Sequence, residues 1–139
     1  MTVQPISTSA SYTADRSWLG SLHGIDSTET ITLDITKFTA GTHYQASTDP
    51  VQPYSRVLSG VPVARITASG LYGPYDPAAT DGRQQLAGLV FADAVFSPGQ
   101  TKVAAAMLWH GVVRTTKVPG GIDPSKVLPS STGPLIRFV

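Results

Sequence analysis

The sequence predicts a mainly β fold: a small barrel-like or mixed β domain with at most one or two short helical turns, plus a flexible N-terminal arm. Charged residues make up only 14% of the chain, against roughly a quarter in ordinary soluble domains. Glu29 is the only glutamate, whereas long surface helices are usually rich in Glu and Lys. Ser, Thr, Gly and Pro make up the difference, and this mixture favours strands and turns.

Residues 1–16 predict the arm, because they are polar, rich in Ser and Thr, and carry little to bury. A chain of 139 residues suits one domain, so residues 17–139 are expected to form a single β-rich unit. Trp18 and Leu19 follow the arm directly. A tryptophan at this place needs an apolar surface, either in its own domain or on a partner, and both alternatives are open.

The clearest strand is "TETITLDITKF", in which Ile31, Leu33 and Ile35 alternate with polar residues. Residues 39–55 follow as a long loop, since two X-Pro steps favour extended or turn conformations.

The segment "VLSGVPVARITASG" predicts a pair of strands or one bent strand, with Gly60 and Gly70 at its ends. Its candidates for burial are Val61, Val63, Ile66 and Ala68.

The stretch "LYGPYDPAATDGRQQLAGLVF" predicts two strands joined by a turn, the second strand running through residues 89–91. Asp76 precedes a proline and initiates a turn, and Asp81-Gly82 is a tight-turn pair. An acid-lined metal or acid/base loop is the alternative. The oxygen ligands that a calcium loop places at alternate positions are missing, so the turn is favoured.

Three elements are expected near the C-terminus. The stretch "TKVAAAMLWHGVVRTTKV" predicts strand, turn and strand with the break at Gly111, although its alanines also suit a short helix. "GGIDPSKVLP" predicts one helical turn with Asp123 as N-cap. "GPLIRFV" predicts a closing strand whose partly buried side chains are Leu135, Ile136, Phe138 and Val139.

The sequence supplies no catalytic residues, metal site or cofactor site. There is no cysteine, no phosphate-binding glycine loop and no nucleophile-elbow motif. His23, His43 and His110 show none of the short spacings of metal ligands.

Charge and hydropathy exclude two further classes of protein. The formal net charge is only +1 and no basic stripe occurs, so direct nucleic-acid binding is not expected. No apolar run approaches the roughly 18 residues of a membrane helix, and the N-terminus lacks the pattern of a signal peptide. A soluble, non-secreted protein is therefore expected.

Four collinear pieces resemble the lambda-type head decoration proteins of tailed bacteriophages, in the versions found in phages of actinobacteria. They are "SWLGSLHGIDSTETITLDITKFTAGTHY", "SGVPVARI", "ITASGLYGPYDPAATDGRQQLAGLVFADAVF" and "AAMLWHGVV". The resemblance covers residues 17–115 and leaves the segment 114–134 without a family motif.

The resemblance implies a non-enzymatic cement protein without a cofactor. Members form trimers on the outer surface of the expanded capsid, near local three-fold positions, and lock neighbouring major capsid proteins together. Their partners are the major capsid protein and further copies of themselves. The protein would be located on the virion after assembly in the host cytoplasm.

The resemblance and the residues together give candidate contact residues. The family's arm becomes ordered on the major capsid protein, and a Ser/Thr-rich arm can add a strand to an exposed sheet edge. The candidates for capsid binding are Thr2, Val3, Gln4, Pro5, Ile6, Trp18 and Leu19. The candidates for trimer contacts or core packing are Trp109, with core favoured, Tyr72 and Tyr75.

Two other classes of function are open. One is another virion-associated module, tail-bound or carbohydrate-binding, which exposed aromatics grouped on one face would favour. The other is a small oligomeric hydrolase, for which the motifs are missing.

Overall fold

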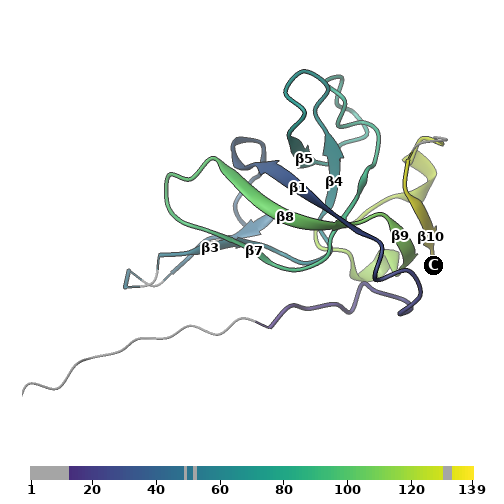
Figure 1. Ribbon diagram of the computed structural model, residues 1–139, viewed down its shortest axis with the longest axis horizontal. Coiled ribbons are helices and arrows are strands. Elements are labelled where there is room, and N and C mark those ends of the chain that lie inside the picture. Colours follow the sequence, from purple (N-terminus) through teal and green to yellow (C-terminus); the bar gives the residue numbers. More distant parts are fainter. Residues whose placement is uncertain (1–12, 49, 52, 130–132) are drawn as a thin grey trace, which may run out of the picture.

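The computed structural model describes residues 13–48, 50–51, 53–129 and 133–139. Short strands dominate it and its only helical elements are three-residue 3-10 turns, which confirms the mainly β prediction (Figure 1). The strands are β1 (Thr28–Asp34), β2 (Tyr44–Gln45), β3 (Ser55–Val57), β4 (Pro62–Arg65), β5 (Tyr72–Pro74), β6 (Gly88–Val90), β7 (Ala94–Phe96), β8 (Lys102–Leu108), β9 (His110–Val113) and β10 (Leu135–Phe138). The 3-10 turns are η1 (Ile35–Lys37), η2 (Thr115–Lys117) and η3 (Pro124–Lys126).

A closed barrel in the strand order β1-β5-β4-β6-β8 forms the centre of the molecule. Its longest ladder joins β1 and β8 in antiparallel register, from Thr28 opposite Leu108 to Asp34 opposite Lys102. The other seams are shorter, and β1 meets β5 at the single pair Leu33–Tyr72. The barrel is therefore held mainly by one long ladder and is weakly joined at the β1/β5 seam.

The alternation in β1 and β8 directs one face of each strand into the barrel. Ile31 and Leu33 are buried while their polar neighbours on β1 are exposed or half-buried. In β8 the buried residues Val103, Ala105 and Met107 alternate in the same way. The alanine run of β8 is therefore a strand, because each of its residues lies opposite a residue of β1.

Two smaller sheets flank the barrel. β2, β3 and β7 form an antiparallel sheet whose inner face adds Val57, Ala94 and Phe96 to the barrel core. β9 and β10 pair in parallel. They cover a second apolar cluster in which Trp18, Leu89, Leu108, Val113 and Val118 are buried.

The turn chemistry agrees with the sequence predictions. Asp76 Oδ1 accepts a hydrogen bond from the Ala78 amide at 2.9 Å, and Gly82 has a φ of 111°. Asp123 caps η3 by accepting from the Ser125 amide at 3.0 Å. The segment 57–70 contains one complete strand, β4, which lies between the left-handed Gly60 and Gly70, and Val57 is the last residue of β3.

Four details differ from the predictions. Ala68 is exposed, because the chain turns directly after Ile66. Leu135 and Val139 are 62% and 58% exposed, since only alternate residues of β10 face the second cluster. The break between β8 and β9 falls at Trp109, and Gly111 lies inside β9. The expected loop 39–55 contains β2, which pairs with β3.

Candidate functional site

The predicted arm residues Thr2, Val3, Gln4, Pro5 and Ile6 lie outside the described residues. The described chain begins at residue 13, and residues 18–20 then run antiparallel to β9. The Gly20 amide donates to the Val112 carbonyl at 2.9 Å, and the Arg114 amide donates to the Trp18 carbonyl at 2.6 Å. Backbone hydrogen bonds therefore fix the base of the N-terminal segment to the domain.

Trp18 packs in the core of its own domain, and not on a partner, which decides between the two alternatives that the sequence left open. Its side chain is 0% exposed, and its indole Nε1 donates to Ser59 Oγ at 3.1 Å. Ser59 Oγ in turn donates to the Phe91 carbonyl at 2.7 Å. The side chain of Trp18 has no exposed surface for a capsid subunit and instead ties the N-terminal segment to the chain around β6.

Leu19 lies at the surface beside Trp18 and lines an apolar hollow of about 360 Å³. Leu22, Ile25 and Phe91 form the rest of its apolar wall, and Arg16, Gly20 and Ser21 complete the lining. The Arg16 guanidinium lies 4.2 Å from the centroid of the Phe91 ring, a cation–π distance. Leu22 is 76% exposed, so this hollow leaves apolar surface in water at the point where the N-terminal segment enters the domain.

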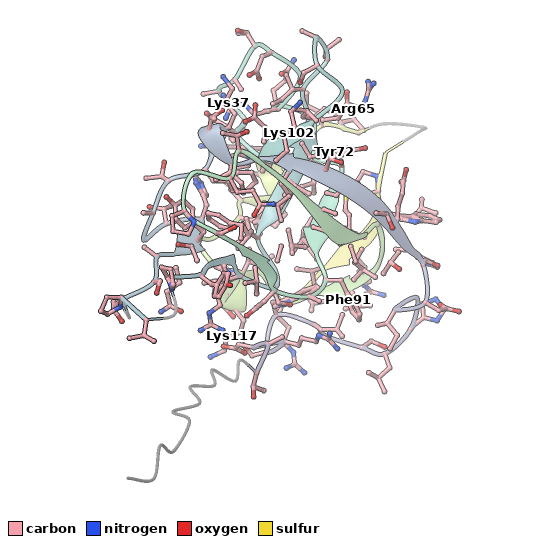
Figure 2. The ribbon with its side chains drawn as sticks, turned by 60° about the vertical axis from the view of Figure 1, so that its left-hand side comes forward. Lys37, Arg65, Tyr72, Phe91, Lys102 and Lys117 are labelled. Carbon is pink, nitrogen blue, oxygen red and sulfur yellow. The ribbon has the colours of Figure 1, made fainter. Side chains whose placement is uncertain are left out.

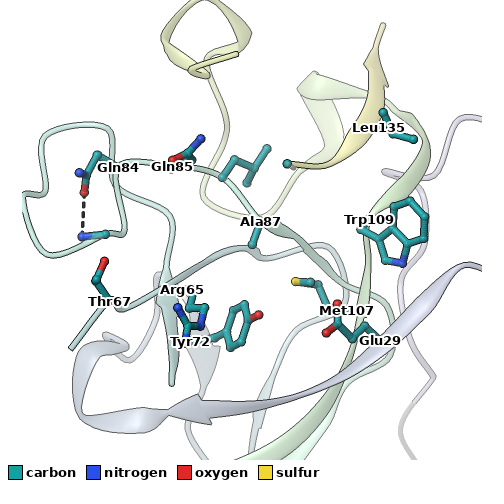
Figure 3. Close-up of a pocket in the computed structure, with 13 residues that line it drawn as sticks. Glu29, Arg65, Thr67, Tyr72, Gln84, Gln85, Ala87, Met107, Trp109 and Leu135 are labelled. Atoms are coloured by element: carbon teal, nitrogen blue, oxygen red, sulfur yellow. Dashed lines mark hydrogen bonds between the residues drawn. The ribbon is translucent and has the colours of Figure 1, made fainter. Parts of the chain in front are cut away.

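Tyr72 and Trp109 share a second depression, a groove of about 620 Å³ (Figure 3). Both side chains are half-buried and pack against the barrel core. The core placement favoured for Trp109 is therefore only partly right, because the ring lines the groove and stacks on His110 at 26°. The sequence candidates Tyr72 and Trp109 thus lie in one groove, whereas Leu19 does not.

The groove carries two opposite charges. Figure 3 shows Glu29 of β1 and Arg65 of β4 on its floor, with Tyr72 and Met107 between them. Neither charged group forms an ion pair or side-chain hydrogen bond with another described residue. Burial and the Glu29 carboxylate raise the pKa of Tyr72, and Arg65 opposes the shift, so the phenol is a neutral hydrogen-bonding group at physiological pH.

Tyr75 lines neither the hollow beside Leu19 nor the groove. Its hydroxyl donates to the Lys126 carbonyl at 3.1 Å and so attaches η3 to the barrel. Burial raises the pKa of Tyr75, and Asp123 and Asp76 add to the shift. This tyrosine has a structural contact within its own chain.

Two of the three histidines meet in space. The rings of His23 and His110 contact edge to face with centroids 5.2 Å apart, while His43 contacts Phe38. In the described part of the chain, no group of three or more His, Asp or Glu could hold a metal ion. No described helix is long and apolar enough to cross a membrane.

The hollow beside Leu19 was only partly visible in the sequence. The sequence shows Leu22 as an apolar residue of "SWLGSLHGID", but its exposure is visible only in the structure. The contact of Arg16 with Phe91 joins residues 75 positions apart. The groove shows the same limit. Glu29 stands out as the only glutamate, yet its approach to Arg65 and Tyr72 depends on barrel closure.

Figure 2 separates the two surfaces: Phe91 of the hollow lies at one end of the barrel, and Arg65 and Tyr72 of the groove lie toward the other. The hollow and the groove are therefore separate surfaces of the molecule.

Comparison with known proteins identifies the family. A family model described as bacteriophage lambda head decoration protein D matches residues 27–124. The match starts later than the resemblance over 17–115 and extends further, so it includes part of the segment that had no family motif. Neither a curated protein nor a solved structure gives a significant match. Because the model covers most of the chain, the protein belongs to the bacteriophage lambda head decoration protein D family, a family of structural capsid proteins.

Proposed function

We propose that this chain binds the outer surface of an expanded phage head as a homotrimer near local three-fold positions. There it stabilises the shell by bridging major capsid protein subunits. The observation that carries the proposal is the family match over residues 27–124. The protein is then a virion component, assembled onto heads in the host cytoplasm, and has no catalytic role.

The N-terminal segment 1–16 and the hollow at its base form the proposed capsid contact. Leu19, Leu22 and Phe91 supply apolar surface that a capsid side chain can cover, and such burial contributes about 25 cal/mol per Å² of apolar area. Trp18 supports this contact indirectly, because its buried indole holds the base of the segment to the domain.

A trimer suits this contact for a physical reason. Ordering a polar segment on a partner costs conformational entropy, which lowers the affinity of each single site. Three segments in one oligomer act together at high effective concentration and offset that cost. A closed ring of three copies needs two different faces on each copy.

The test compares binding to expanded heads that lack this protein, measured by co-sedimentation. A variant that begins at residue 13 is expected to keep its fold and its trimer but to bind the heads much more weakly. Unexpanded heads are expected to bind neither protein. Undiminished binding by the shortened protein would remove the N-terminal segment from the mechanism.

Two surface substitutions test the hollow. Leu22→Ser should weaken head binding, since Leu22 is 76% exposed in the hollow. Val95→Ser is the matched control, because Val95 is also exposed but lies on β7. Light scattering on the free protein measures the oligomer. A monomer that ignores heads and is retained on a glycan resin would favour a carbohydrate-binding module instead.

A further inference from the structure

One edge of β1 is largely unpaired in the barrel. The Ile35 amide donates to the Thr101 carbonyl at 2.8 Å, and antiparallel pairs alternate along a ladder. Glu29, Ile31 and Leu33 therefore exchange hydrogen bonds with β8. The backbone groups of Thr28 and Thr30 point the other way, toward β5.

No described strand meets β1 at that place. The β1/β5 pairing consists of Leu33 and Tyr72 alone, and no described residue gives Thr28 or Thr30 another backbone hydrogen bond. Both residues are exposed. Among the described residues, the N–H and C=O groups on this side of the first half of β1 thus have no partner, and such an edge is a template for another strand.

The groove of about 620 Å³ lies along this part of β1. Glu29 contributes from β1, Tyr72 from β5 and Arg65 from β4, so the groove occupies the place where β5 and β1 diverge (Figure 3). A bound peptide would find backbone partners on one side and the two uncompensated charges of Glu29 and Arg65 on its floor.

We propose that an extended segment of the phage shell protein adds as a strand to the Thr28–Thr30 edge and occupies this groove. The proposal rests on the proposed function and names a second head contact, apart from the N-terminal segment. The segment carries a basic side chain for Glu29 and an acidic side chain for Arg65. Main-chain hydrogen bonds provide affinity in this mode, and the charges provide specificity.

The polarity of the groove favours the shell protein over a second copy of this chain. Its lining includes Thr67, Gln84 and Gln85 in addition to the two charges. Permanent subunit interfaces are usually more apolar than the rest of the surface, whereas contacts between separately folded partners resemble it. A groove of this kind stays hydrated in the free protein and is available when the protein meets the head.

Hydrogen exchange of the protein bound to expanded heads tests the strand directly. In the free protein, the amides of Glu29 and Ile31 should exchange slowly and those of Thr28 and Thr30 quickly. Binding to heads should slow Thr28 and Thr30. If wild-type protein binds heads and both amides stay fast, the added strand is refuted while the proposed function stands.

Variants supply the second measurement. Thr30→Pro removes an unpaired N–H and places a ring on the edge, a substitution that edge strands tolerate. Glu29→Arg reverses one groove charge without changing the backbone, so it tests the groove even if the proline variant folds poorly. Each should weaken head binding by about tenfold or more, the effect of losing one or two good polar contacts. Lys102→Glu is the matched charge reversal, exposed at the opposite end of the β1/β8 ladder, and should bind normally.

The outcomes separate the possibilities. Normal head binding by both groove variants overturns the proposal. Loss of the oligomer in Glu29→Arg, measured by light scattering, overturns it in favour of a contact between copies. A wild-type protein that binds no heads refutes the proposed function itself.

Discussion

At the scale of single residues, the close packing of Trp18 against Gly60 requires a glycine at position 60. Gly60 has a φ of 95°, and a Cβ placed on it would lie 2.5 Å from Trp18 Cδ1. Trp18 is fully buried there and bonded to Ser59. The indole therefore lies directly against the backbone of the turn between β3 and β4, where only glycine leaves enough room.

Gly60→Ala should destabilise the protein by about 2–4 kcal/mol, since backbone strain and a clash with a rigid ring combine. Gly41→Ala is the matched control, because Gly41 also has a positive φ of 82° but nothing within 4 Å of an added Cβ. It should cost only the backbone strain, about 1–2 kcal/mol. Urea unfolding of both variants measures the difference, and equal losses would contradict the close packing of Trp18.

His43 should make the stability depend on pH. The Thr39 amide donates to His43 Nδ1 at 2.9 Å, which requires a ring unprotonated at that atom. Burial lowers the pKa of His43 below its ordinary value of 6.5, and Arg83 adds to the shift. Because the folded chain disfavours the protonated ring, this stabilisation is complete above about pH 6.5 and is lost as the pH falls through the lower folded pKa.

The measurement compares urea midpoints near neutral pH and about 2 units below it, around the ordinary histidine pKa. His43→Asn keeps an acceptor near the Nδ1 position but does not titrate, so it should lose less stability on acidification than the wild-type protein. The same pH dependence in both proteins would assign the effect to other groups.

At the scale of elements, β10 shows how one short strand separates two roles. Ile136 and Phe138 pack on the second cluster with Trp18, while Leu135 points to the groove side and is 62% exposed. The strand is thus both a cover for the core and a border of the groove.

Phe138→Ala should cost about 1–3 kcal/mol, below the range for fully buried phenylalanines because Phe138 is only half-buried. Leu135→Ala lies on the same strand and should change stability by no more than about 0.5 kcal/mol, as exposed substitutions usually do. Thermal or urea unfolding of the pair is the measurement. Comparable losses would mean that β10 packs with the opposite face inward.

Elements with a local pattern could be predicted from the sequence. The alternation of Ile31 and Leu33 predicted β1, and Asp123 with its proline predicted the capped turn η3. The partners of these elements could not be predicted, since the β1/β8 ladder joins residues as far apart as Thr28 and Leu108 through backbone groups that every sequence carries. For the same reason the groove was unpredicted, although Tyr72 and Trp109 were candidates.

At the scale of the whole molecule, the buried apolar residues described form two clusters rather than one. The first fills the barrel. The second combines Trp18 near the start of the chain with Phe138 near its end. Leu89 and Leu108 come from β6 and β8 of the barrel but belong to the second cluster, so the barrel wall is shared by both.

This sharing predicts that residues 17–139 unfold as one domain. In Trp109→Phe the remaining tryptophan, Trp18, reports the second cluster by fluorescence, while far-ultraviolet circular dichroism reports the strands of the barrel. The two urea transitions should have the same midpoint, as in other small single domains. Separate midpoints would divide the chain into two units.

The attachment of residues 18–20 to β9 has a mechanical consequence. If the N-terminal segment is held by a shell under internal pressure, tension passes along the chain to Trp18 before it reaches any strand of the barrel. The bonds from Gly20 to Val112 and from Arg114 to Trp18 then carry the load together with the buried indole. Detaching the N-terminal segment from the domain would require extracting the Trp18 side chain from the core. The attachment of the segment therefore depends on the packing of the core.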